Sequence, residues 1–255
     1  MTICNWGPTA TPEFLTECAQ IADRSTLDAI WFNDNLGFPP ELPEGIPSPP
    51  ATGDILDPPG FANFLAACAS RIKFGTGVLV LPYRPEIVTQ KLLTTIQVLS
   101  GNRFLLGIGA GYLEGEFNAL GVSKSQRGKL TDQTIDFLRE SADHEHIESN
   151  GYPLLLKPKL NCPPIYIGGA ADIAIPRTVS RGDGWMPMGT LPADLAPAIA
   201  KLHEAGAAAG RKGLEVVTMK TLPMEDPAAA IEMAQAYQQA GVTRHPMMMV
   251  PPMWS

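Results

Sequence analysis

Short runs of β-branched, aromatic and other apolar residues alternate with longer segments of helical periodicity along the whole chain. This alternation is typical of repeated βα units that build a parallel sheet. The apolar runs predict eight strands, at Thr2–Trp6, Ala29–Asn33, Lys73–Leu81, Phe104–Gly109, Pro164–Gly168, Gly184–Met188, Leu214–Lys220 and Val242–Met248.

Seven helices are predicted between these strands, at Pro12–Asp23, Phe61–Ser70, Glu86–Leu99, Thr131–Ala142, Ile173–Ser180, Ala193–Ala209 and Pro227–Ala240. Thr11-Pro12 and Asp226-Pro227 each place a capping side chain before a proline at the first helical position. Eight strands and seven helices predict an α/β fold, a single (β/α)8 TIM-barrel domain over residues 1–255 that lacks its last outer helix.

Two long insertions interrupt the alternation, and each follows a strand. The first, Asp34–Gly60, holds eight prolines, which exclude a helix or a central strand there. Its length favours a lid or binding loop, and the alternative is a surface loop without a functional role. The second insertion is Tyr112–Leu130. Because the loops after the strands of a parallel barrel meet on one face, we expect a substrate cavity on that face.

The composition and charge of the chain indicate which kinds of binding partner are unlikely. The 255 residues include 45% hydrophobic and 18% charged residues and carry a formal net charge of -7. An acidic chain is poorly suited to nucleic acid or anionic membranes. The N-terminus has no signal-peptide pattern, and no apolar run approaches the ~18 residues of a membrane span. We therefore expect a cytoplasmic protein with no membrane or nucleic-acid partner.

A metal site is not expected. The four cysteines are widely spaced, with no Cys-x-x-Cys pair. His144 and His146 are two residues apart, so they do not share a helix face, and no third ligand is indicated.

The glycine-rich run from Gly107 to Gly111 suggests a dinucleotide-binding loop, but its spacing excludes one. The third glycine of that motif would fall at Tyr112 or Glu114, depending on the register. What is left is a strand that ends in a rim without side chains. Such a rim suits a flat ring lying against the backbone, and close packing at a barrel mouth is an equally good explanation.

Several linked segments resemble the luciferase-like monooxygenase family. They are Ile72–Pro85, Leu99–Tyr112, Arg127-Gly128, Pro163–Gly169 and Arg181–Pro187. Within that family, the short motifs Gly-Thr-Gly-Val, Gly-Ala-Gly-Tyr and Ile-Gly-Gly are most similar to those of the branch that uses the deazaflavin coenzyme F420.

The resemblance implies a flavin-type ring at the C-terminal mouth of the barrel. The ring would rest on a bulge of the third strand with a non-proline cis peptide at Gly77–Val78. The cofactor phosphate is expected where backbone N–H groups precede a helix at Gly168–Ala171. By its position Arg177 could add positive charge there, and an ordinary surface arginine is the favoured interpretation. The implied cofactor-binding residues are Gly77, Val78, Gly109, Gly111, Gly168, Gly169, Ala170 and Ala171.

Three residues are predicted to line the reacting face: Asp34, Asn35 and Tyr112. Relatives commonly carry Asp-His at the end of the second strand, whereas this chain has Asp34-Asn35. Asparagine forms hydrogen bonds but does not exchange a proton near pH 7. Tyr112 is then the nearest proton donor, and a ring-packing role is its alternative.

The leading hypothesis is a flavin-type oxidoreductase that transfers a hydride between reduced coenzyme F420 and a small organic substrate under the Asp34–Gly60 loop. An FMN-dependent monooxygenase of the same fold is the alternative. A third hypothesis, from another class, is a barrel that binds a flavin without catalysis. A homodimer is expected, since a missing last helix would leave apolar barrel surface for a partner to cover.

Overall fold

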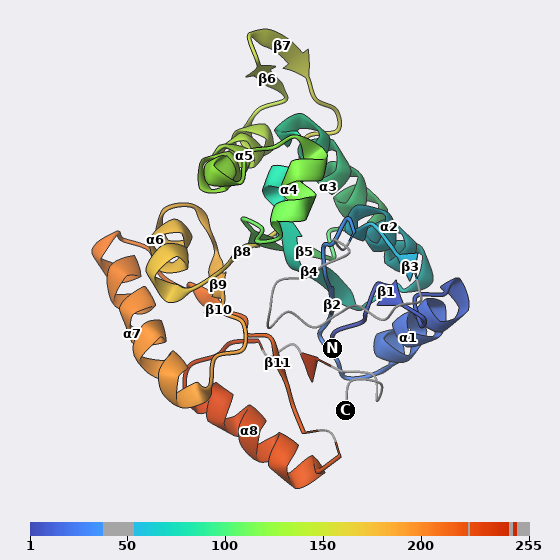
Figure 1. Ribbon diagram of the computed structural model, residues 1–255, viewed down its shortest axis with the longest axis vertical. Coiled ribbons are helices and arrows are strands. Elements are labelled where there is room, and N and C mark those ends of the chain that lie inside the picture. The colour runs from blue at the N-terminus through green and yellow to red at the C-terminus, as the bar shows by residue number, and fades with distance from the viewer. Residues whose placement is uncertain (38–53, 224, 245–246, 249–255) are drawn as a thin grey trace.

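The computed structural model describes residues 1–37, 54–223, 225–244 and 247–248. Its centre is a sheet of six parallel strands in the order β10-β9-β8-β5-β4-β2. Helices surround these strands on the outside (Figure 1). The six strands are β2 (Ala29–Phe32), β4 (Lys73–Val80), β5 (Phe104–Gly109), β8 (Ile165–Gly168), β9 (Gly184–Met186) and β10 (Glu215–Val216).

Further parallel pairing extends this sheet at both edges. Thr2 pairs with Trp31, and Val217 pairs with Arg244. Beyond that point β11 (Lys220–Thr221) pairs in parallel with β12 (Met247–Met248). Each of the eight predicted strands therefore has residues in parallel pairing, in chain order, and the (β/α)8-barrel fold class is confirmed.

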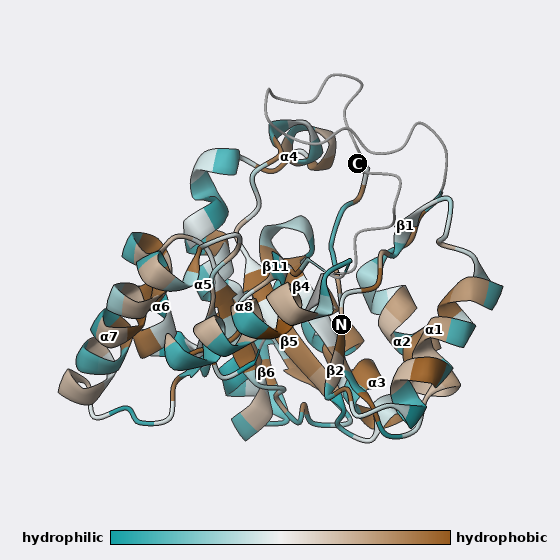
Figure 2. Cartoon of the chain, turned by 90° about the horizontal axis from the view of Figure 1, so that it is seen from below, coloured by the Kyte–Doolittle hydropathy of each residue, from teal (hydrophilic) through white to brown (hydrophobic). Residues whose placement is uncertain are grey.

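The core has two compartments because both faces of a barrel strand are buried. Side chains that point inward, such as Trp31, Tyr166 and Met219, form one buried cluster. Trp31 and Tyr166 meet edge to face there, with ring centroids 6.0 Å apart. A larger cluster lies between the strands and the helices. Figure 2 accordingly shows hydrophobic residues concentrated in β2 and β5.

All seven predicted helices are present, with small shifts at their ends. They are α1 (Pro12–Arg24), α2 (Pro58–Cys68), α3 (Glu86–Ser100), α5 (Arg127–Asp143), α6 (Ala171–Arg181), α7 (Pro192–Ala208) and α8 (Pro227–Gln239). Both predicted caps form: Thr11 accepts from the Phe14 N–H group, and Asp226 accepts from those of Ala228 and Ala229.

The prediction of an irregular segment from Asp34 to Gly60 is wrong at its C-terminal end. Asp54–Ile55 forms β3, which pairs antiparallel with β1 (Trp6–Gly7). Helix α2 begins at Pro58, and Asp57 caps it by accepting from the Gly60 N–H group. Two prolines are tolerated there because the first turn of a helix needs no N–H donors. The part of this insertion at 38–53 lies outside the described residues.

The second insertion is also more regular than predicted. It contains α4 (Glu114–Leu120) and the short 3-10 helix η2 (Lys124–Gln126), and α5 begins within it. A further antiparallel hairpin, β6 (His146–Ser149) with β7 (Tyr152–Leu155), projects from the barrel after α5 (Figure 1). The predicted absence of a last helix concerns residues 249–255, which lie outside the described residues. Among the described helices, none has the length and apolar character needed to cross a membrane.

Asp23 fastens the end of α1 to the start of β4. Its carboxylate accepts from the backbone N–H groups of Ser70, Arg71 and Ile72 at 2.7–3.0 Å, and from the Ser70 hydroxyl. Burial alone would raise the pKa of Asp23, but these hydrogen bonds hold it well below its usual range.

This arrangement predicts a pH-dependent stability. The ionised Asp23 stabilises the fold above its unfolded-state pKa of about 3.9, and the contribution is lost as the pH falls further. We expect Asp23→Asn to be less stable than the wild type at pH 7, with a gap that narrows below about pH 4. Urea denaturation at pH 7 and pH 3 measures both gaps, and an equal gap at the two pH values would contradict this role.

Candidate functional site

The third barrel strand carries a bulge at its C-terminal end. Pairing of β4 with β5 shifts register between Thr76 and Leu79. Within this shift, the peptide bond between Gly77 and Val78 is cis. The bulge and the cis bond are both confirmed at the positions that the family resemblance implied.

Val78 from this bulge packs on bare backbone of two neighbouring strands. A Cβ atom added to Gly109 would lie 2.5 Å from Val78 Cγ2, and one added to Gly168 would lie 2.8 Å from Val78 Cγ1. Both distances are shorter than real carbon contacts, so any side chain at either glycine would displace Val78. Because these glycines have no side chains, Val78 packs directly on the backbone of β5 and β8. Val78 and this exposed backbone form a smooth wall.

This wall borders a cavity of about 520 Å³ at the C-terminal ends of the strands. Such a volume is in the range of small-molecule sites. The cavity is lined by Val78, Gly109, Ala110, Gly111, Tyr112, Ser125, Arg127, Gly128, Gly168, Gly169, Ala170, Ile173, Arg177, Met186 and Met188.

Six of the eight residues predicted to bind a cofactor line this cavity. They are Val78, Gly109, Gly111, Gly168, Gly169 and Ala170. Gly77 faces Met219 instead, because a Cβ added there would lie 2.4 Å from the Met219 sulfur atom. Ala171 is the first residue of α6. Of the three residues predicted for the reacting face, Tyr112 lines the cavity, whereas Asp34 and Asn35 are not among its lining residues.

Two arginines supply positive charge to the cavity. Arg127 is the first residue of α5 and donates to the Lys124 carbonyl oxygen at 3.1 Å. Arg177 lies on α6, with its side chain only 14% exposed, and pairs with Asp132 at 2.6 Å. Of the two interpretations of Arg177, the favoured one, an ordinary surface arginine, is therefore wrong, and its place in the cavity lining agrees with the one in which it adds charge. The N-terminus of α6 has no side-chain cap, so its dipole adds to the positive end of the cavity.

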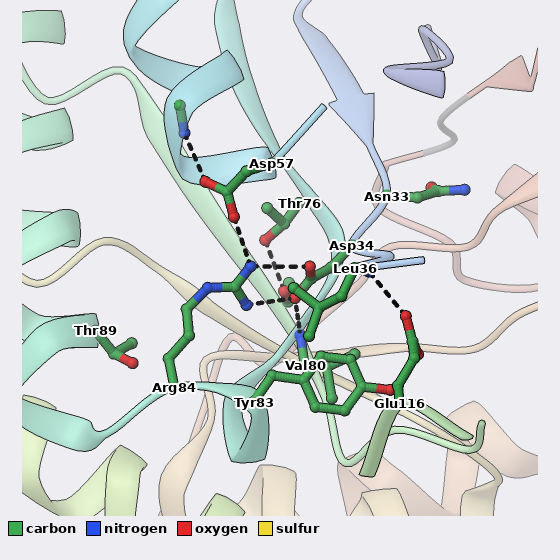
Figure 3. A network of polar contacts seen from close by, with 12 residues as sticks. Asn33, Asp34, Leu36, Asp57, Thr76, Val80, Tyr83, Arg84, Thr89 and Glu116 are labelled. Atoms are coloured by element: carbon green, nitrogen blue, oxygen red, sulfur yellow. Dashed lines mark hydrogen bonds and ion pairs between the residues drawn. The ribbon is translucent and has the colours of Figure 1, made fainter. Parts of the chain in front are cut away.

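Asp34 belongs to a buried ion-pair network next to the bulge (Figure 3). Its carboxylate is fully buried and accepts from Arg84 at 2.7 and 3.0 Å and from the Val80 N–H group at 2.9 Å. Arg84 also binds Asp57 at 2.8 Å. Burial alone would lower the pKa of Arg84, but the two carboxylates raise it above its usual value. Asp34 thus fixes β2, β4 and α2 relative to one another.

Glu116 of α4 joins the insertion to the segment after β2. Its side chain is buried and accepts from the Tyr83 hydroxyl and, at 2.8 Å, from the Leu36 N–H group (Figure 3). Burial and the hydrogen bond to Glu116 raise the pKa of Tyr83. Residues that follow two different strands are thereby held together at the rim of the barrel.

Tyr112 brings a phenol hydroxyl to the cavity, a group that can donate a hydrogen bond or a proton. It is 58% exposed. Partial burial and the charge of Glu116 raise the pKa of its hydroxyl. Tyr112 therefore stays protonated at neutral pH, as a hydrogen-bond or proton donor must.

The cavity lining also includes residues that were not predicted for the site, among them Ser125, Arg127, Arg177, Met186 and Met188. Arg127 had a usable signal, because Arg127-Gly128 is one of the segments that resemble the family. Met186 ends β9 and Met188 lies two residues further on, and both look like core residues in the sequence.

Comparison with known proteins places the chain in a family. The model of the luciferase-like monooxygenase family matches residues 3–249. The chain belongs to this family. Luciferase-like proteins are oxidoreductases or monooxygenases that act on small molecules. An uncharacterized protein of Mycobacterium tuberculosis is 28% identical over 211 residues, which cover 78% of this chain and 73% of that protein.

Similar proteins of named function include F420-dependent dehydrogenases and a monooxygenase. The F420-dependent glucose-6-phosphate dehydrogenase of Amycolatopsis mediterranei is 26% identical over 69% of this chain and 53% of its own length. The fold is similar to an F420-dependent secondary alcohol dehydrogenase in complex with an F420-acetone adduct, with a TM-score of 0.79, 14% identity and coverage of 96% and 91% of the two chains. A monooxygenase of Streptomyces bottropensis gives a TM-score of 0.70 at 17% identity, covering 92% and 75%.

Proposed function

We propose that this protein is an oxidoreductase that transfers a hydride between the deazaflavin coenzyme F420 and a small organic substrate. The cavity carries this proposal, because it combines a wall of bare backbone with a cationic end. Among the described residues, its lining includes two arginines and no carboxylate. A flat ring with an anionic tail fits that distribution.

The ring would be held by Val78 on one side and by the backbone around Gly109 and Gly168. Side chains at either glycine would push Val78 into the space that the ring needs. When bound, the cofactor would donate the hydride to a carbonyl substrate or accept it from an alcohol, while the protein orients the substrate and excludes water.

The phosphate of the tail would be held by Arg127, Arg177 and the uncapped N-terminus of α6. Charge-assisted hydrogen bonds from guanidinium groups to phosphate are among the stronger polar contacts. Helix N-termini add backbone donors and a favourable dipole. The predicted contacts at Gly168–Ala171 belong to this same end of the cavity.

Tyr112 is proposed as the residue that donates a hydrogen bond or proton to the reacting oxygen. We expect Tyr112→Phe to lower kcat by about 10²-fold or more, as is typical of a lost general acid, with little change in the Kd of the cofactor. Steady-state kinetics together with a binding titration measure the two effects. An unchanged kcat would leave Tyr112 with a packing role. Asn35 stays a prediction for the same face.

Titration of the purified protein with F420 and, separately, with FMN tests the choice of cofactor through the change in ring fluorescence. We expect F420 to bind more tightly. Preferred binding of FMN would favour the monooxygenase alternative, and failure to bind either would defeat both. Binding of F420 without turnover of any alcohol, ketone or enone in a substrate panel would support the non-catalytic alternative.

The homodimer, the cytoplasmic location and the lack of nucleic-acid binding stay predictions from the sequence.

A further inference from the structure

Asn33 follows β2 on the side that faces the inside of the barrel. Successive side chains of a strand point to opposite faces. Ala29 and Trp31 belong to the inner cluster, whereas Ile30 and Phe32 belong to the outer one. Continuing this alternation, Asn33 points inward and Asp34 outward. Figure 3 agrees, since the Asn33 side chain extends away from Asp34 and its ion-pair network.

The backbone of Asn33 is clamped in place by a second asparagine. The Asn5 amide accepts from the Asn33 N–H group at 3.1 Å and donates to the Asn33 carbonyl oxygen at 3.0 Å. A third bond from Asn5 reaches the Leu56 carbonyl oxygen at 2.7 Å. Asn5 is thus a structural asparagine with its amide fully used, and it fixes where the Asn33 side chain emerges.

The side chain of Asn33, unlike that of Asn5, has a polar atom without a hydrogen bond to any described residue. Its Oδ1 atom is buried and has no hydrogen-bond partner among the described residues. An unsatisfied buried acceptor destabilises a protein, so natural structures seldom keep one without a use. A structural role gives no reason for this atom to stay unpaired.

The position of Asn33 connects it with the proposed cofactor cavity. Pairing of β2 with β4 ends with Phe32 opposite Thr76. Asn33 and Gly77 are the next residues of these two strands, and Gly77 precedes the cavity residue Val78. The amide therefore lies on the strand next to the bulge, at the mouth of the barrel, although Asn33 is not itself among the residues that line the cavity.

We propose that the Asn33 amide binds the oxygen of the substrate, and that this substrate carries a hydroxyl or carbonyl group. The inference rests on the proposed function. An amide suits both members of such a pair, because its oxygen accepts from an alcohol and its NH₂ group donates to a ketone. It also stays neutral, so it orients the oxygen while the proton comes from elsewhere. Asn33 is thus a specificity-determining residue.

Thermal unfolding without cofactor tests this role independently of activity. Asn33→Leu replaces the unpaired amide with an apolar side chain of related shape. We expect its unfolding midpoint to rise by about 2–4 °C, because an unsatisfied acceptor is removed. Asn5→Leu is the matched control, and its midpoint should fall because three hydrogen bonds are lost. A fall for Asn33→Leu would show a structural role and overturn the proposal.

The second measurement uses F420 with cyclohexanol and cyclohexanone as probes. We expect Asn33→Leu to lower kcat/KM by about 10–100-fold, chiefly through KM, since a site that hydrogen-bonds a substrate oxygen loses that contact. The Kd of F420 should stay within about twofold. Unchanged kinetics, or an equal loss of cofactor binding, would overturn the substrate role. If the wild type binds neither F420 nor FMN, the proposed function fails, and the unfolding midpoints still decide whether Asn33 is structural.

Discussion

Replacing Arg84 with methionine is expected to lower the free energy of unfolding by about 3–5 kcal/mol, the usual loss when one partner of a buried ion pair is removed. The Asp34 carboxylate is fully buried, and Arg84 is its only cationic partner among the described residues. Among the described residues, the change leaves this charge with the Val80 N–H group as its one remaining donor. Urea denaturation at pH 7 measures the effect.

Arg181→Met is the matched control for this prediction. Arg181 also makes a bidentate pair, with Asp136, at 2.8 and 3.0 Å. Its side chain is 34% exposed and that of Asp136 is 56% exposed, so water screens the pair and its loss should cost about 0–1 kcal/mol. Equal losses in the free energy of unfolding for the two variants would show that burial does not make the Asp34–Arg84 pair more stabilising than an exposed pair.

Arg127→Ala is expected to weaken F420 binding by about 10–100-fold, the effect of one or two charge-assisted hydrogen bonds. Arg127 lines the cationic end of the cavity, and the Lys124 carbonyl oxygen is the acceptor that it has there. Its other guanidinium donors have no hydrogen-bond acceptor in the part of the chain that the structure describes, so they are available for phosphate. A fluorescence titration at two salt concentrations measures the loss, which should be smaller at high salt.

Lys129→Ala controls for a general loss of positive charge. Lys129 lies on the same first turn of α5, is exposed, and is not among the residues that line the cavity. We expect its Kd for F420 to stay within about twofold of the wild type. Similar losses for the two variants would mean that the cavity attracts the cofactor only through long-range charge.

The barrel strands were predictable because their apolar runs are buried on both faces. Phe104–Gly109 was predicted with its exact bounds, and the hydrophobic effect explains why such a run forms an inner strand. The β6–β7 hairpin gave no such signal. It projects from the barrel, and three of the four residues in β7 are exposed, so few of its positions are buried and its apolar pattern is weak.

The ends of elements were harder to predict where local geometry overrides a residue's average preference. Pro58 and Pro59 looked like loop residues, yet both begin α2 behind the Asp57 cap. The sequence does not predict α4 (Glu114–Leu120), because seven residues are too few to show a clear helical period.

The candidate site was predicted only where the family resemblance reached it. That resemblance located the bulge at Gly77–Val78 and most of the glycine wall. It did not indicate that Arg127 and Arg177, which belong to different helices, both line the cavity. The alternation along β2 also held a signal for Asn33, but only the structure shows that its amide oxygen has no partner among the described residues.

A crystal structure of the protein with coenzyme F420 bound is the most direct test of whether this cavity holds the cofactor. We predict that the ring lies against Val78 and the backbone of Gly109, with the phosphate within hydrogen-bond distance of Arg127 or Arg177. A ring bound elsewhere on the barrel, or a phosphate that contacts neither arginine, would contradict the proposed site.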